Sequence, residues 1–73
     1  MTAKEMFDFI GYKEQYEGNE VIIYVSEAFD DYAVVFDLGN KTYYAKNRYD
    51  YLEVSPMLHN AIHEQCKKLG WLE

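Results

Sequence analysis

Three side chains that can bind a metal ion lie close together near the end of the 73-residue chain. In the segment HNAIHEQC, His59 and His63 are four residues apart, and Cys66 follows three residues later. On an α-helix, which turns by about 100° per residue, the three would lie within roughly 60° of one another. A zinc site would need a fourth ligand from elsewhere and partners that orient the imidazoles. We therefore interpret Cys66 as a small core residue and the histidines as boundary residues, and we predict no metal and no cofactor.

A catalytic interpretation of the same segment fails on chemistry. The segment is similar to the zinc-protease motif His-Glu-x-x-His, but Asn60 stands where the glutamate must accept a proton, which an amide cannot do. A nucleophilic Cys66 activated by His63 would also need an oxyanion site. The sequence contains neither a glycine-rich phosphate loop nor a Gly-x-Ser-x-Gly motif. We predict that the protein is not an enzyme and has no catalytic residues.

A second constellation lies in residues 41–53, KTYYAKNRYDYLE, which hold four of the eight tyrosines and three of the seven basic residues. Proteins that bind single-stranded nucleic acid place aromatic side chains on one sheet face within a positive groove. The segment fits that description, but it fits an ordinary edge strand that runs into a loop equally well. The distribution of charge and the faces of the expected strands decide between the two.

The net charge of −6 lies in the first part of the chain. Residues 1–40 contain nine acidic residues and two lysines, whereas residues 41–73 contain four acidic and five basic residues, which gives −7 and +1. An acidic surface repels nucleic acid and anionic membranes, because both are bound through basic groups. We predict no direct nucleic-acid partner and no membrane partner. The single cysteine, with no hydrophobic run long enough for a signal peptide or a membrane span, favours a cytoplasmic protein.

Signals for a helix stand near each end of the chain. A capping box at Thr2 and Glu5, followed by apolar residues at helical spacing, predicts a helix that ends at Ile10. Ser55 is a suitable N-cap for a second helix over residues 56–69. Each predicted helix is followed by a glycine, which readily takes the left-handed conformation that ends a helix.

Between the helices, runs of branched and aromatic residues predict three strands, at residues 21–25, 32–38 and 42–46. Two segments are interpreted as connections, at residues 12–20 and 27–31. The expected fold class is α+β: an N-terminal helix, a three-stranded antiparallel β-meander and a C-terminal helix packed on one sheet face. So short a chain can bury one core only, so residues 1–73 are predicted to form a single small domain.

A tight hairpin at Gly39-Asn40 fixes the register of the last two strands. It pairs Phe36 with Tyr43 and Val35 with Tyr44, and alternation then places the two pairs on opposite faces. Phe36 and Tyr43 are assigned to the core. In the first strand, the residues that suit the core face are Val21, Ile23 and Val25.

The opposite, outer face of the sheet is expected to be half apolar. The predicted protein-binding residues on it are Ile22, Tyr24, Val35 and Tyr44. Tyr49 and Tyr51 lie beyond the hairpin and do not continue this row, so a base-stacking platform is not favoured.

Three stretches of the sequence, MTAKEMFDFIGY, VVFDLGNKTYYA and AIHEQCKKLGWLE, resemble a group of small proteins encoded by phages and prophages of Gram-positive bacteria. The resemblance covers both ends and the hairpin, and residues 47–54 depart from it. It implies a small protein that acts by binding something in a host cell. It carries no functional residue over to this chain.

We predict a small acidic protein that binds a protein partner, either a host protein or a second copy in a homodimer, through the outer face. The alternative is an acidic DNA mimic that inhibits a nucleic-acid-binding protein of the host, which the charge of residues 1–40 motivates. A metal-binding protein or an enzyme requires more assumptions than either.

Overall fold

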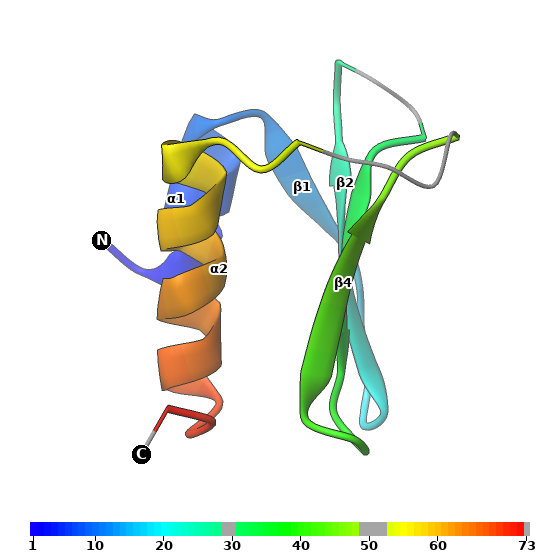
Figure 1. Cartoon of the computed structure of the whole chain (residues 1–73), viewed down its shortest axis with the longest axis vertical. Helices are drawn as coiled ribbons and strands as arrows, with labels where there is room; N and C mark the ends of the chain where they lie inside the picture. The colour runs from blue at the N-terminus through cyan, green and yellow to red at the C-terminus, as the bar shows by residue number, and fades with distance from the viewer. Residues whose placement is uncertain (29–30, 49–52, 73) are drawn as a thin grey trace.

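The computed structural model describes residues 1–28, 31–48 and 53–72. These residues form six elements, in the order α1 (Ala3–Phe9), β1 (Tyr12–Glu17), β2 (Val21–Ser26), β3 (Ala33–Asp37), β4 (Thr42–Lys46) and α2 (Pro56–Lys68). The strands form one antiparallel sheet in the order β1-β2-β3-β4, and both helices lie on the same side of it (Figure 1). The α+β class and the terminal positions of the two helices are confirmed.

The sheet has a fourth strand, β1, so the prediction of three strands was wrong. β1 occupies most of residues 12–20, which were expected to be a connection. Its sequence, YKEQYE, is polar because β1 is an edge strand in which Tyr12 alone is buried. A bulge between Glu14 and Tyr16 also interrupts the alternation of side chains. An edge strand with one buried side chain leaves no apolar periodicity in the sequence.

The hairpin between β3 and β4 has the predicted register with a longer turn. Phe36 pairs with Tyr43 and Val35 pairs with Tyr44. Four residues separate the two strands, and the residue with a positive φ is Lys41, at 58°, rather than a glycine. A two-residue turn at 39–40 and a four-residue turn at 38–41 are centred on the same residues, so both give the same strand pairing. The predicted register is therefore confirmed, whereas the predicted turn length was wrong.

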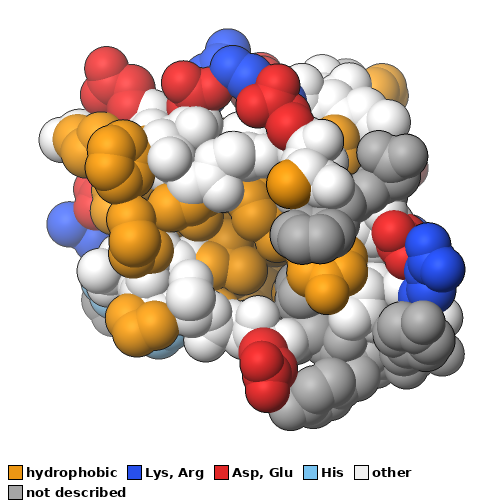
Figure 2. Space-filling model, turned by 90° about the horizontal axis from the view of Figure 1, so that it is seen from above, with side chains coloured by type: hydrophobic (Ala, Val, Ile, Leu, Met, Phe, Trp, Pro, Cys, Tyr) orange, Lys and Arg blue, Asp and Glu red, His pale blue; other side chains and the backbone are white. Residues whose placement is uncertain are grey.

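The hydrophobic core lies between the sheet and the helices. Phe7 of α1 and Val34 and Phe36 of β3 are fully buried. The residues of α2 that complete the core are Leu58, Ala61, Ile62 and Cys66. At the end of the molecule where β1 begins, hydrophobic side chains line a hollow in the surface (Figure 2). A pocket at this end is lined by residues that include Ile10, Tyr12, Tyr32 and Leu58.

The side chains of β2 face the opposite way from the prediction. Ile22 and Tyr24, which the sequence assigned to the outer face, are buried in the core, with exposed fractions of 4% and 2%. Ile22 is the cross-strand partner of Phe36, and Tyr24 is the partner of Val34. Because every residue of VIIYV is apolar, alternation alone cannot select the set that faces the core, and a shift of one residue exchanges the faces.

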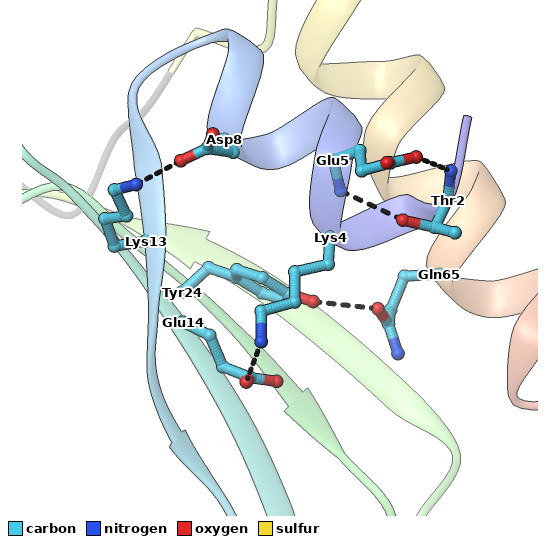
Figure 3. A network of polar contacts seen from close by, with 8 residues as sticks. All are labelled: Thr2, Lys4, Glu5, Asp8, Lys13, Glu14, Tyr24 and Gln65. Atoms are coloured by element: carbon cyan, nitrogen blue, oxygen red, sulfur yellow. Dashed lines mark hydrogen bonds and ion pairs between the residues drawn. The ribbon is translucent and has the colours of Figure 1, made fainter.

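Tyr24 connects the sheet with both helices. Its ring stacks on that of Phe7 with a centroid distance of 3.9 Å and an interplanar angle of 13°. Its hydroxyl donates a hydrogen bond to Oε1 of Gln65, at 3.1 Å (Figure 3), and Gln65 is 3% exposed. Burial raises the pKa of Tyr24 to about 12, and the nearby Glu14 and Glu17 carboxylates add to the shift.

Side-chain caps fix where the two helices begin. The Thr2 hydroxyl accepts a hydrogen bond from the Glu5 N–H at 3.1 Å, and the Glu5 carboxylate accepts one from the Thr2 N–H at 2.9 Å, so the predicted capping box is confirmed (Figure 3). The Ser55 hydroxyl accepts a hydrogen bond from the Leu58 N–H at 3.1 Å. Each helix ends one residue earlier than predicted and is followed by a glycine with positive φ.

Candidate functional site

The face of the sheet that points away from the helices carries apolar side chains across all four strands. Successive residues of a strand point to opposite faces, so the neighbours of the buried Tyr24 in β2 point outward. The cross-strand register forms one continuous row: Tyr16, Ile23, Val35 and Tyr44. We use the term outer face for this row together with Val21, Val25 and Ala33.

Protein groups shield the outer face from solvent only in part. Tyr16 and Tyr44, on the two edge strands, are about half exposed, Ile23 is partly exposed, and Val35 is buried. Neither described helix lies on this side of the sheet (Figure 1). An antiparallel sheet with one solvated face usually alternates apolar and polar residues. β2 and β3 do not, because their outward residues are mostly aliphatic.

Tyr44 stands between two open hollows of the outer face. One, of about 620 Å³, is lined mainly by apolar residues of β2 and β3 and extends to Asp31 and Lys46. The other, of about 440 Å³, extends to Glu20 and Asp37 at the opposite end of the strands. Small-molecule sites usually enclose most of their ligand. Open hollows on either side of an aromatic ridge suit another protein surface better.

One end of the outer face is acidic. The Asp37 carboxylate accepts hydrogen bonds from the Asn40 N–H and side-chain amide at 3.1 and 2.9 Å, and from the Gly39 N–H at 3.1 Å. These hydrogen bonds lower the pKa of Asp37, and those from Asn40 have the largest effect. Asp37 therefore stays charged well below neutral pH. Glu20 is exposed and lines the same hollow as Asp37.

The other end of the outer face carries a positive charge. Lys46 is exposed and forms no ion pair with another described residue. Asp31, at the same end, is paired with Arg48 at 2.6 Å, and the hydrogen bond from Arg48 lowers the pKa of Asp31. The Asp31 charge is therefore compensated locally, and the described charges that line the two hollows differ in sign between the two ends.

The structure places two of the four predicted protein-binding residues on the outer face. Val35 and Tyr44 lie there as cross-strand partners. Ile22 and Tyr24 do not, because they belong to the core. The outward residues that the sequence reasoning missed are Tyr16, Val21, Ile23 and Val25. The available signal was Gln65, a polar residue in the apolar stripe of the second predicted helix, which indicates a buried polar partner such as the Tyr24 hydroxyl.

Tyr43 and Tyr44 are adjacent and lie on opposite faces. Tyr43 points to the helical side, as predicted, with its ring centroid 5.8 Å from that of Phe36. It is 47% exposed, however, and Tyr44 is 52% exposed, so Tyr43 lies at the margin of the core rather than within it. Tyr49 and Tyr51, which were predicted to lie off the outer face, are outside the described residues.

Burial separates the three potential metal ligands of α2. His59 and His63 are exposed, and their rings stack with a centroid distance of 6.4 Å. Cys66 is buried in the core, and burial raises the pKa of its thiol, which disfavours the thiolate that would bind a metal. Within residues 1–28, 31–48 and 53–72, no group of three or more His, Cys, Asp and Glu side chains could hold a metal ion.

Comparison of the chain with protein-family models, with curated proteins and with solved structures finds no match. Neither of the described helices is long and apolar enough to cross a membrane.

Proposed function

We propose that the protein is a non-enzymatic binding module that associates with another protein surface through the outer face. The observation that carries this proposal is the composition of β2 and β3. Their sequences, VIIYVS and AVVFD, are apolar on both sides of the sheet, which is typical of strands that are covered on both sides. The helices cover one side (Figure 1). We propose that a second protein surface covers the other side of the sheet.

The row across the sheet is suited to supply the binding energy. Tyr16 and Tyr44 stand on either side of the aliphatic Ile23 and Val35. Tyrosine offers a large contact area at low entropic cost, and a few such residues dominate most interfaces. Burying roughly 300 Å² of apolar area contributes about 7.5 kcal/mol at 25 cal/mol per Å². Association itself costs about 4 to 15 kcal/mol, so binding needs the whole row rather than a single residue.

The alternative, an acidic DNA mimic, draws on the charge of −7 in residues 1–40. Ion pairs in α1 and β1 weaken it. Lys13 binds Asp8, and the Lys4 ammonium lies 3.5 Å from the Glu14 carboxylate (Figure 3). Part of the acidic surface is thus compensated locally, whereas mimicry of a phosphate backbone needs exposed and unpaired acids. We place this alternative second.

The resemblance to phage and prophage proteins adds a proposed setting. We propose that the protein acts in the cytoplasm of a bacterial host cell, where its partner is a host protein or a second copy of the chain. The single unpaired thiol of Cys66 is compatible with a reducing compartment.

Site-specific crosslinking in cells tests the outer face directly. The photoreactive residue p-benzoylphenylalanine is introduced in place of Tyr44, and the matched control carries it in place of Tyr43. The two positions are adjacent and similarly exposed, at 52% and 47%, and differ in the face on which they lie. We expect crosslinked protein from position 44 and little from position 43. Equal yields from both positions, or none from position 44, would contradict the proposed function.

A further inference from the structure

The charges and the shape of the outer face favour one occupant. We propose that a second copy of the chain covers the outer face, sheet against sheet, about a two-fold axis that crosses the strands along the row from Tyr16 to Tyr44. This inference rests on the proposed function, because it uses the same surface and names its partner.

Charge complementarity favours this axis. Among the described residues that line the two hollows, Lys46 lies at one end of the strands, while Glu20 and Asp37 lie at the other. When the exposed Lys41 of the β3–β4 turn is counted with Glu20 and Asp37, that end keeps a net charge of −1, opposite to that of Lys46. A two-fold axis along the strands would bring like ends together. An axis across the strands reverses the second sheet and places each strand opposite its counterpart, so that each Lys46 comes near Asp37 of the other copy. Because the axis is two-fold, each dimer contains two equivalent contacts of this kind.

The shape of the row favours the same axis. An axis across the strands maps the row onto itself, so Tyr44 of each copy comes close to Tyr44 of the other. Each Tyr44 has an open hollow on either side of it along the strands. The ring of the second copy can therefore lie in a hollow beside its counterpart instead of meeting it head-on. Packed sheets lie about 10 Å apart with strands about 30° from parallel, which such interdigitation allows.

The size of the face suits a weak dimer. Four strands at about 4.8 Å spacing, with five or six residues at about 3.3 Å each, give a face of roughly 19 by 18 Å. Weak but specific interfaces bury somewhat less than 600 Å² per partner. The projected area of this face, roughly 340 Å² from these strand dimensions, lies below that limit. The proposed dimer is therefore small, and we expect a dissociation constant in the micromolar range. Such an affinity is accessible to sedimentation and light scattering.

Two adjacent tyrosines provide the first test of the dimer. Sedimentation equilibrium between about 10 μM and 1 mM measures the dissociation constant of the parent, of Tyr44→Ala and of the matched control Tyr43→Ala. We expect Tyr44→Ala to raise the constant at least ten-fold, because the symmetric interface loses the ring twice, and Tyr43→Ala to change it less than two-fold. Circular dichroism checks that each variant is folded. A parent that remains monomeric at 1 mM, or an undiminished Tyr44→Ala dimer, would overturn the proposal.

Charge exchange tests the direction of the axis. Lys46→Glu and Asp37→Lys should each weaken the dimer several-fold, and the double variant should recover most of the parent affinity, because opposite charges again face each other. Weakening by each single change without recovery in the double variant would overturn the axis across the strands. Dilution of the unmodified protein, followed by NMR, needs no variant. Amide shifts should change in the outer-face residues of the four strands, and shifts confined to the helices would also overturn the dimer.

The crosslinking experiment separates this inference from the function on which it rests. Mass spectrometry of the product at position 44 identifies what was captured. A second copy of the chain supports the dimer. A different protein retains the binding function of the outer face and overturns the dimer, whereas the absence of any product contradicts both.

Discussion

The hydrogen bond between Tyr24 and Gln65 offers a sharp test of which way β2 faces. The Tyr24 hydroxyl donates to Gln65 Oε1 at 3.1 Å, and both side chains are almost completely buried. Tyr24→Phe retains the ring and its stacking on Phe7 but leaves the Gln65 oxygen without this donor. An unsatisfied buried acceptor costs about 1 to 3 kcal/mol. For a domain of this size, a loss of about 2 kcal/mol lowers the melting temperature by roughly 8 to 16 °C.

Urea and thermal unfolding, followed by circular dichroism, measure the loss. Tyr44→Phe is the matched control, since it removes a hydroxyl from an exposed tyrosine and should change the free energy of unfolding by less than about 0.5 kcal/mol. Adding Gln65→Met to Tyr24→Phe replaces both polar partners and should cost clearly less than the two single changes together. If Tyr24→Phe is as stable as the parent, the hydroxyl is not held in the core and the assignment of the β2 faces is wrong.

Three further predictions concern the core and α2. Because burial raises the pKa of Tyr24 from 10.0 to about 12, the folded state holds the phenolic proton more tightly than the unfolded state. The associated stability is complete below pH 10 and falls by about 2 to 3 kcal/mol towards pH 12; equal losses in the parent and in Tyr24→Phe would contradict this. Phe36→Ala empties a fully buried site and should cost about 3 to 5 kcal/mol in urea unfolding, so a melting temperature within a degree or two of the parent would be inconsistent with the core. Zinc at modest excess should leave the melting temperature unchanged, because the Cys66 thiol is buried away from the exposed histidines; a rise that His63→Ala abolishes would refute this.

Local signals were sufficient for the helices and for the β3–β4 hairpin. The capping hydrogen bonds at Thr2, Glu5 and Ser55 join residues that are three apart in the sequence, so they can be predicted from the sequence directly. The pairing of Phe36 with Tyr43 followed from the loop between the strands, and the same pairing tolerates a longer turn. Features that depend on contacts close in sequence could therefore be predicted.

Features that depend on distant contacts could not. β1 is polar because one of its edges is open and few of its side chains are buried, so its pairing with β2 has no apolar signature. The faces of β2 were assigned wrongly because Ile22 and Ile23 are equally apolar, and only pairing with β3 distinguishes them. The prediction placed the candidate site on the outer face and assigned Val35 and Tyr44 to it correctly. In β2 it named Ile22 and Tyr24, which belong to the core.

Two adjacent isoleucines test the central claim, that the outer face is a protein-binding surface, most directly. Threonine is β-branched like isoleucine and retains strand propensity, so Ile22→Thr and Ile23→Thr differ mainly in the face that they alter. Both are measured for stability and for crosslinking through p-benzoylphenylalanine in place of Tyr44. We predict that Ile23→Thr melts within a few degrees of the parent yet loses most of the crosslinked product, whereas Ile22→Thr is destabilised by about 2 kcal/mol or more. A stable Ile23→Thr protein that crosslinks as well as the parent would contradict the account.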